Sequence, residues 1–362
     1  MKKIVILLLL LWIPISIKAV GTSATSAILM DQDSGRILYG SNIHEVRSVA
    51  SISKVMTAIV AVESGKLKDK ITIGDEIAGA HGSGIYIKKG EVLTLEDLVY
   101  GLMLRSGNDA SLAIAHYVGG SVDRFVNQMN QKAVELGMKD TTFYNPNGLD
   151  DDEEGNYSTA YDMALLMSYA MKNPDFAKIV GTSKYKLKTN MNTYIWYNKN
   201  KLLSGYQYTT GGKTGFTKKA RRTLVTSATK GDLNLVAVTL NDGNDFEDHK
   251  NLFEYGFSNY ENYLVLEKGT LTLEEDYYKN YKVYIKQNIT YPLQDGEKES
   301  LNLKYQLIKN KTVKDETKIG TIYLYLGDKE VRQEPIYAAK IEKKSNKTGF
   351  FTKIKDWFCH LW

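Results

Sequence analysis

Residues 47–57 (RSVASISKVMT) place Ser51 and Lys54 three positions apart at the start of an apolar run. The apolar residues of this run recur at helical spacing: Ile52, Val55, Met56 and Ile59. Residues three apart on a helix lie on one face, one turn from each other. The pattern therefore predicts a helix, ending near Gly65, that holds the ammonium group of Lys54 beside the hydroxyl of Ser51.

This pairing matters because a serine hydroxyl is a weak nucleophile until a neighbouring base takes its proton. A lysine serves as that base only when burial or nearby positive charge keeps it neutral. The helix N-terminus adds positive potential, and its backbone N–H groups can face a developing oxyanion. The run predicts a nucleophile, Ser51, and a general base, Lys54.

The Ser-x-x-Lys spacing alone is weak evidence, because the chain contains a second copy at Ser227 and Lys230. That copy lies in a stretch, TLVTSATK, that alternates like a strand and has no partner motifs downstream. The first copy is followed in order by 106–108 (SGN) and 213–215 (KTG). Three short motifs in a fixed order indicate one catalytic site far better than any of them alone.

The local patterns around these motifs predict their structural setting. A hairpin is expected first, with strands at 27–30 and 36–39. Thr94 and Asp97 form the pattern of a capping box at the start of a helix that ends at Arg105, so that SGN lies in the link to the next helix. The KTG motif is expected on a strand just before an antiparallel hairpin at 223–229 and 233–240.

Two connecting segments in this region have no assigned role from the sequence. The glycine-rich loop 81–90 is interpreted equally well as a border of the site or as a plain connection. The long polar loop 141–162 has the length of a functional loop. Its acidic residues 150–154 match a calcium loop only loosely, and a solvated surface is favoured.

Both ends of the chain differ from its body. Residues 1–19 have a basic start, an apolar core and Ala19 at a cleavage position, which is typical of a secretory signal peptide, with an uncleaved anchor as the alternative. From about Tyr263 the chain changes to short strand-like runs, which predict a small all-β domain. Residues 350–362 show an apolar helical face too short to span a bilayer, which favours a helix lying in the membrane interface over one docked on the protein itself. The expected segments are the signal peptide at 1–19, the domain that carries the three motifs at 20–262, the β-rich domain at 263–340, and a basic linker with the amphipathic helix at 341–362.

Composition excludes several classes of function. The formal net charge of +5 includes three leader lysines, so the mature body would carry about +2, which gives no support to a nucleic-acid partner. The single cysteine, Cys359, rules out an intrachain disulfide and a zinc–thiolate site. The five histidines show no ligand spacing, so no metal or other cofactor is expected.

With these residues in place, the sequence resembles the serine D-alanyl-D-alanine carboxypeptidases, the low-molecular-mass penicillin-binding proteins. Besides the three motifs, the stretches KKGEVLTLEDLVYGLMLRSGNDAS, NPNGLDD, YSTAYDMA and KTGFT are similar to those of the family. The resemblance implies an α/β catalytic domain with an antiparallel sheet flanked by helices. It also implies a small all-β C-terminal domain, an amphipathic tail helix, and a location on the outer face of the bacterial membrane.

The resemblance also implies a role for each motif residue. Ser51 would attack the peptide bond between two D-alanines of a peptidoglycan stem peptide, with Lys54 as base. The N–H groups of Ser51 and Phe216 would form the oxyanion hole. Ser106 would relay a proton to the leaving amine, and Asn108 would hold the substrate amide or Lys54. Lys213 and Thr214 would bind the terminal carboxylate, Gly215 would let the substrate lie along the strand, and β-lactams would trap Ser51.

One departure and two alternatives accompany this resemblance. Arg221 and Arg222 follow the third motif where more neutral residues are expected, which would either bias substrate choice or only mark a subfamily. The residue between Ser106 and Asn108 is Gly107, and no suitably placed glutamate precedes the third motif, which disfavours a class A β-lactamase. A DD-endopeptidase that uses the same residues, and a catalytically silent wall-binding scaffold, remain as alternatives.

Overall fold

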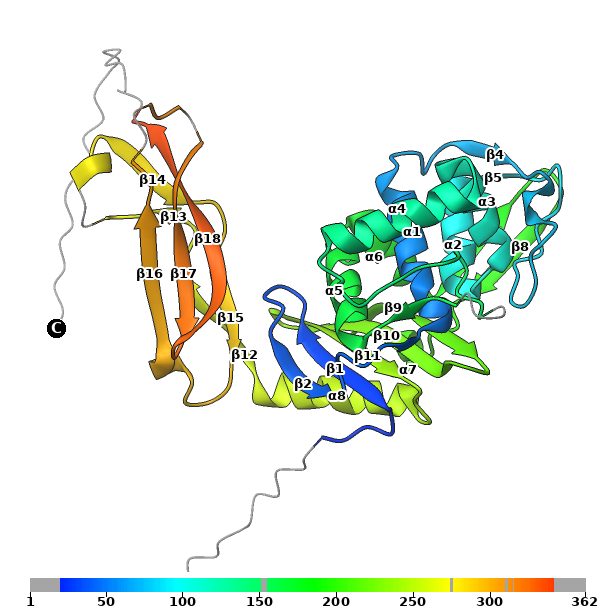
Figure 1. Cartoon of the computed structure of the whole chain (residues 1–362), viewed down its shortest axis with the longest axis horizontal. Coiled ribbons are helices and arrows are strands. Elements are labelled where there is room, and N and C mark those ends of the chain that lie inside the picture. Colours follow the sequence, from blue (N-terminus) through cyan, green and yellow to red (C-terminus); the bar gives the residue numbers. More distant parts are fainter. Residues whose placement is uncertain (1–19, 151–154, 274–275, 310–311, 315, 342–362) are drawn as a thin grey trace, which may run out of the picture. The chain divides into compact units, whose positions relative to one another are not determined.

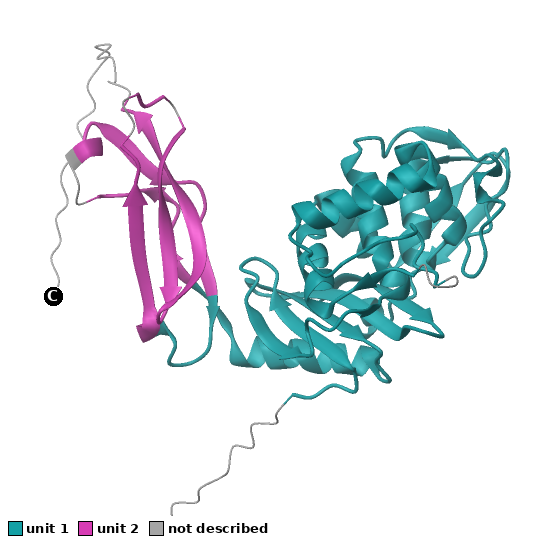
Figure 2. Cartoon of the chain, in the orientation of Figure 1, with its two compact units in different colours: residues 1–263, 292–298 teal, residues 264–291, 299–362 magenta. Residues whose placement is uncertain are grey.

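The structure is a computed structural model that describes residues 20–150, 155–273, 276–309, 312–314 and 316–341. The predicted leader, the predicted tail helix and residues 151–154 lie outside this part of the chain. The chain divides into two compact units (Figure 2). The first comprises the described residues up to Tyr263 together with Pro292–Lys298, and the second comprises Leu264–Tyr291 and the described residues from Glu299 onward.

The first unit is built on a five-stranded antiparallel sheet in the order β2-β1-β11-β10-β9. Its strands are β1 (Ser26–Asp31), β2 (Ile37–Ser41), β9 (Thr209–Thr217), β10 (Arg221–Lys230) and β11 (Leu233–Leu240). The hairpins expected at the N-terminus and between β10 and β11 are confirmed. The KTG motif lies on β9, the edge strand, which leaves one side of its backbone free of strand partners.

Helices cover both faces of this sheet (Figure 1). On one face lie η1 (Ala50–Ser53), α1 (Lys54–Glu63), α2 (Leu95–Arg105), α3 (Asn108–Gly119), α4 (Val122–Glu135), α5 (Ala160–Ala170) and α6 (Pro174–Val180). The other face is covered by α8 (Asp245–Asn259), and a short helix α7 (Leu202–Gly205) precedes β9. Three two-stranded ladders complete the unit: β3 (Arg47–Ser48) with β6 (Tyr157–Ser158), β4 (Lys70–Thr72) with β5 (Val92–Thr94), and β7 (Lys184–Lys188) with β8 (Thr193–Tyr197).

The alternation of side chains along the strands explains the two layers. On β1, Ile28 and Met30 belong to the core beneath the helices that surround α1, whereas Leu29 belongs to the core beneath α8. Successive side chains of a strand point to opposite faces of the sheet, so one strand contributes to both cores. Helix α1 lies at the centre of the larger core, and every residue from Lys54 to Ile59 is buried.

The start of α1 differs in one respect from the expectation. Ser51 lies in the 3-10 turn η1, and the α-helix begins at Lys54. Ala50, which opens the turn, has a positive φ of 49°. In a 3-10 turn residues three apart eclipse each other, so Lys54 lies directly beside Ser51. The capping box at Thr94 and Asp97 is present as predicted.

The second unit is all-β, as predicted. Its five-stranded sheet has the order β13-β14-β18-β17-β16. The strands are β13 (Gly269–Thr270), β14 (Tyr281–Ile285), β16 (Leu301–Leu307), β17 (Thr317–Leu326) and β18 (Lys329–Lys340). A separate two-stranded ladder, whose residues are divided between the two units, pairs β12 (Glu261–Leu266) with β15 (Ile289–Leu293). Across the described residues, no helix has the length and hydropathy that crossing a bilayer requires.

Candidate active site

Ser51 lies at the mouth of a pocket, at the level where η1 meets the edge strand β9. Its Oγ is 3.1 Å from Nζ of Lys54 and 3.5 Å from the backbone carbonyl oxygen of Asn147. Ser51 is partly exposed, whereas its neighbours along the turn are buried. The nucleophile predicted from the sequence therefore reaches solvent while its surroundings are held by the core.

Lys54 is fully buried, and its surroundings favour the neutral amine. Burial lowers the pKa of Lys54 well below its usual 10.5, and the positive charges of Lys213 and Lys199 lower it further. Its Nζ contacts two groups that only accept hydrogen bonds, the Oδ1 of Asn108 at 2.8 Å and the carbonyl oxygen of Asn147. A neutral amine has two N–H donors for these oxygens and one lone pair, which is then left to accept the proton of the Ser51 hydroxyl.

The SGN motif links α2 to α3, as predicted. Ser106 is the C-cap of α2 in the left-handed conformation, with a φ of 64°. Asn108 opens α3, where its Nδ2 donates to the carbonyl oxygen of His81 at 2.6 Å while its Oδ1 accepts from Lys54. Asn108 thus joins Lys54 to the glycine-rich loop.

The next residue, Asp109, fixes that loop to α3. Its buried carboxylate accepts backbone N–H groups from three successive residues: Ile85, Tyr86 and Ile87. The loop carries Ser83 to the rim of the pocket. The loop 81–90, for which the sequence left two interpretations open, therefore borders the site.

Strand β9 supplies the opposite wall. Lys213 is only 1% exposed, and its Nζ donates to the carbonyl oxygen of Thr214 at 2.7 Å. Burial and the charge of Lys199 lower the pKa of Lys213 to about 7. A Cβ atom on Gly215 would lie 3.1 Å from the backbone nitrogens of both Ser51 and Ile52, so glycine lets the strand approach Ser51. Phe216, which follows, is 60% exposed.

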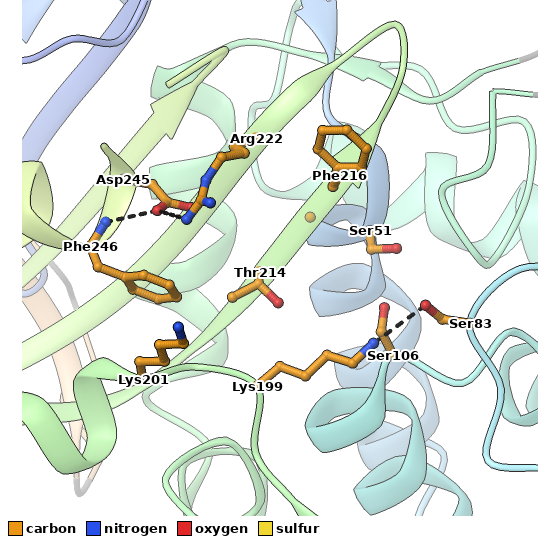
Figure 3. A pocket seen from close by; sticks show the side chains of 11 residues that line it. Ser51, Ser83, Ser106, Lys199, Lys201, Thr214, Phe216, Arg222, Asp245 and Phe246 are labelled. Atoms are coloured by element: carbon orange, nitrogen blue, oxygen red, sulfur yellow. Dashed lines mark hydrogen bonds and ion pairs between the residues drawn. The ribbon is translucent and has the colours of Figure 1, made fainter. Parts of the chain in front are cut away.

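The pocket has a volume of about 450 Å³ (Figure 3). The residues that line it are Ser51, Ser83, Ser106, Lys199, Lys201, Thr214, Gly215, Phe216, Arg222, Asp245 and Phe246. Five of these were predicted from the sequence as site residues. The three others predicted, Lys54, Asn108 and Lys213, are buried in the adjoining wall.

The sequence analysis missed six residues of this site: Ser83, Asn147, Lys199, Lys201, Asp245 and Phe246. Asn147 acts through its backbone carbonyl, which no side-chain pattern reveals. Ser83 lies in a loop with no periodicity, and Lys199 is a single cation in the segment before α7. The signals available were the stretch NPNGLDD, which contains Asn147, and the glycine-rich loop 81–90, which contains Ser83.

In the second Ser-x-x-Lys copy, the serine and the lysine contact other residues and not each other. Ser227 is buried within β10, where its Oγ lies 2.8 Å from the Oγ1 of Thr210. Lys230 ends the same strand with its Nζ 5.2 Å from the ring centre of Tyr208. Residues three apart on a strand point to opposite faces, so this serine and lysine do not meet.

Arg222, which the sequence analysis noted as a departure, forms an ion pair at one end of the pocket. Its guanidinium group pairs with the carboxylate of Asp245 and lies 5.8 Å from the ring centre of Phe246. Among the residues that the structure describes, no group of acidic, histidine and cysteine side chains is arranged to hold a metal ion.

Comparison with known proteins agrees with this geometry. The family model described as D-alanyl-D-alanine carboxypeptidase matches residues 15–244, and that of the penicillin-binding protein 5 C-terminal domain matches residues 260–344. The D-alanyl-D-alanine carboxypeptidase DacF of Bacillus subtilis is 34% identical, covering 92% of this chain and 90% of its own.

Solved structures show the same relationship. Penicillin-binding protein 5 from Haemophilus influenzae is similar with a TM-score of 0.72 and 27% identity, covering 88% of this chain and 97% of its own. Penicillin-binding protein 6B from Escherichia coli gives a TM-score of 0.68 and 29% identity, with coverages of 89% and 97%. On the motifs, the fold and these matches together, the chain belongs to the D-alanyl-D-alanine carboxypeptidase family of serine-type, low-molecular-mass penicillin-binding proteins.

Proposed function

We propose that this protein is a serine D-alanyl-D-alanine carboxypeptidase that removes the terminal D-alanine from peptidoglycan stem peptides through an acyl-enzyme on Ser51. The observation that carries this proposal is the pair formed by Ser51 Oγ and Lys54 Nζ, 3.1 Å apart, with the lysine buried and its pKa lowered. Such a pair supplies an activated nucleophile without a histidine.

In the acylation step, Lys54 takes the proton of Ser51 as Oγ attacks the carbonyl carbon between the two D-alanines. The backbone N–H groups of Ser51 and Phe216 stabilise the oxyanion of the tetrahedral intermediate. Ser106, at the pocket wall, relays a proton to the nitrogen of the leaving D-alanine as the C–N bond breaks. Water then attacks the ester carbonyl, which releases the shortened peptide and restores the Ser51 hydroxyl.

The remaining motif residues orient the substrate and the base. Gly215 lets the peptide lie along the edge of β9, close to Ser51. The hydroxyl of Thr214 faces the pocket and binds the terminal carboxylate, with Lys213 beneath it in the wall. Asn108 holds Lys54 in position through its Oδ1.

The test is covalent labelling with a fluorescent penicillin, followed by mass spectrometry of the labelled peptide. The wild type should carry the adduct on Ser51 and should release D-alanine from a stem pentapeptide, and Ser51→Ala should do neither. Ser227→Ala is the matched control, because it removes the serine of the second motif copy and should leave both reactions intact. An adduct on Ser227, or none on the folded wild type, would refute the proposal.

The preferred bond is tested with a second substrate. A DD-endopeptidase would use the same residues on cross-linked peptide dimers. We expect hydrolysis of the pentapeptide to exceed that of a cross-linked dimer, measured as kcat/KM for each. A higher kcat/KM for the dimer would assign the protein to the endopeptidases instead.

We also propose that the protein works on the extracytoplasmic side of the membrane and is bound there by its C-terminal segment. The support is the sequence pattern of residues 1–19 and 350–362, which both lie outside the described residues. Deletion of residues 349–362 should release the protein from sedimented membranes without reducing penicillin labelling. If the truncated protein still sediments with membranes, this attachment is wrong.

A further inference from the structure

The carboxylate of Asp150 joins two segments that meet at the active site. Its Oδ1 accepts a hydrogen bond from the Oγ of Ser48 at 2.7 Å, and its Oδ2 accepts one from the Oγ1 of Thr217. Ser48 belongs to β3, which leads into η1, and Thr217 is the last residue of β9. The proposed mechanism gives this link no role, although it connects residues that are far apart in the chain.

The two hydroxyl groups are close in sequence to the two proposed oxyanion donors. Ser48 precedes Ser51 by three residues, and Thr217 directly follows Phe216. Ser51 and Phe216 both line the pocket (Figure 3). Two backbone N–H groups stabilise the oxyanion of a tetrahedral intermediate only while both lie within hydrogen-bond distance of it. A link between Ser48 and Thr217 therefore acts on the spacing of the two donors.

The segment that carries Asp150 is itself packed against η1 and the start of α1. The carbonyl oxygen of Asn147 accepts a hydrogen bond from the Nζ of Lys54. A Cβ atom on Gly148 would lie 2.2 Å from the carbonyl oxygen of Ala50, and the φ of Gly148 is 76°, so glycine lets the segment approach the turn this closely. Asp150 is therefore presented from a backbone that is already fixed relative to the turn.

Both hydroxyl partners of Asp150 are held in place by other contacts. The Oγ1 of Thr217 accepts the backbone N–H of Ala220 at 2.9 Å, in the turn between β9 and β10, and donates its one hydrogen to Asp150. Ser48 is 7% exposed, and its backbone pairs with Tyr157 of β6. The carboxylate thus joins two fixed backbones, so its hydrogen bonds hold β9 at one distance from the turn that carries the nucleophile.

We propose that Asp150 is a positioning residue that sets the spacing of the oxyanion hole by joining Ser48 to Thr217. This inference rests on the proposed function. Asp150 is not among the residues that line the pocket, so it acts through the backbones of Ser51 and Phe216 and not on the substrate. A displaced donor weakens the tetrahedral intermediate more than it weakens binding of the uncleaved substrate. The loss of this link therefore lowers the rate of acylation and leaves substrate binding nearly unchanged.

The test compares Asp150→Ala with Asp150→Asn in the full-length protein. Alanine removes both hydrogen bonds. Asparagine removes the charge but keeps both bonds, because its Oδ1 accepts from Thr217 and its Nδ2 donates to the Oγ of Ser48. Asp33→Ala is the matched control, since Asp33 is exposed in the first hairpin and its carboxylate accepts a hydrogen bond from Asn234.

Four quantities separate positioning from a merely structural role. They are kcat and KM for an acetylated tripeptide ending in D-Ala-D-Ala, the rate constant of acylation by benzylpenicillin, the inhibition constant of a peptide boronic acid, and the free energy of unfolding in urea. The boronic acid forms a tetrahedral adduct with a serine hydroxyl, and this adduct places an oxygen in the oxyanion hole. Its affinity therefore reports the hole directly.

For Asp150→Ala we expect the rate constant of acylation and kcat to fall by about 10- to 100-fold with little change in KM, and the boronic acid to bind more weakly by a similar factor. Asp150→Asn should retain most of the wild-type values, and Asp33→Ala should match the wild type. These changes refer to the folded protein, whose fraction the urea measurement gives.

Three outcomes would overturn the inference. The first is an equal loss in Asp150→Asn and Asp150→Ala, because the charge and not the two hydrogen bonds would then matter. The second is wild-type acylation by folded Asp150→Ala. If the alanine variant does not fold, Ser48→Ala replaces it and should show a smaller loss, so the third is wild-type acylation by Ser48→Ala. A wild type that forms no adduct on Ser51 would refute the proposed function itself.

Discussion

At the scale of single residues, the proposed mechanism makes the reactivity of Ser51 depend on the protonation state of Lys54. Burial and the charges of Lys213 and Lys199 lower the pKa of Lys54, while the carboxylate of Asp109 has a smaller, opposing effect. We expect the rate constant of acylation by penicillin to rise with pH as Lys54 loses its proton, with a midpoint well below 10.5. A pH profile of the acylation rate on intact protein measures this midpoint, and a midpoint at or above 10.5 would contradict it.

Lys213→Gln tests the origin of that midpoint. Removing a positive neighbour raises the pKa of Lys54, so the rising limb of the profile should move to higher pH. If the limb instead reported the titration of Lys213 itself, whose pKa is about 7, it would disappear in this variant. Lys188→Gln, which removes a distant charge, should leave the profile unchanged.

At the scale of elements, the closeness of β9 to η1 is set by the absence of a side chain at Gly215. A Cβ atom there would lie 2.3 Å from the Oγ1 of Thr223 and 3.1 Å from the nitrogen of Ser51. Gly215→Ala should move the strand away from Ser51 and lower the rate constant of acylation by about 100-fold, the loss expected when one oxyanion donor is displaced. Gly205→Ala, where a Cβ atom meets nothing within 4 Å, is the matched control. Wild-type acylation by Gly215→Ala would contradict this explanation.

A second element, α8, is fixed to the sheet by a buried histidine. The Nδ1 of His249 lies 2.6 Å from the Oγ1 of Thr226 on β10, and its Nε2 lies 3.0 Å from the Oγ1 of Thr239 on β11. Burial lowers the pKa of His249 from 6.5 to about 3, so the folded protein keeps this imidazole neutral where the unfolded chain would protonate it. The unfolded state then binds more protons between these two values.

The free energy of unfolding should therefore fall as the pH falls below 6.5, with a loss of up to about 5 kcal/mol from His249 as the pH approaches 3. Urea unfolding at a series of pH values measures this dependence. His249→Gln, which cannot be protonated, should show a weaker dependence over the same range. His116→Gln, at an exposed position on α3, is the control and should keep the wild-type pH dependence. An unchanged pH dependence in His249→Gln would show that His249 is not the cause of the loss of stability.

At the scale of the whole chain, the first unit is completed by residues that follow part of the second. The chain leaves the first unit after Tyr263 and returns to it at Pro292–Lys298, whereas the sequence suggested one change of character near Tyr263. Arg36, at the end of the turn that precedes β2, donates to the carbonyl oxygen of Pro292 and forms an ion pair with Glu297 at 2.6 Å. The returning segment is thus held against the first hairpin.

Arg36→Ala should lower the free energy of unfolding by about 1–3 kcal/mol, because it removes charged hydrogen bonds that are only partly exposed. It should also make residues 292–298 more susceptible to limited proteolysis, which mass spectrometry of the fragments would detect. Lys250→Ala, which removes an exposed and loosely formed pair with Glu247, should change stability by less than about 0.5 kcal/mol. Equal effects of the two variants would show that the Arg36 contacts do not hold the segment.

The sequence by itself determined the features that depend on neighbours along the chain. The pairing of Ser51 with Lys54, the capping box at Thr94 and the two hairpins β1–β2 and β10–β11 follow from spacing within a few residues. Local backbone geometry decides such features, so periodicity and turn residues are sufficient to predict them. The order of the three motifs then indicated the family.

Only the tertiary structure decided which distant groups meet at the site. It buried Lys213, brought the backbone carbonyl of Asn147 to Lys54 and placed Lys199 at the pocket wall. The positions of these three residues depend on where each loop and strand lies once the helices have packed on the sheet. A local sequence pattern contains no information about such long-range packing. The sequence therefore pointed to Ser51 and Lys54 as a pair, whereas packing of the core decided which other residues line the pocket around them.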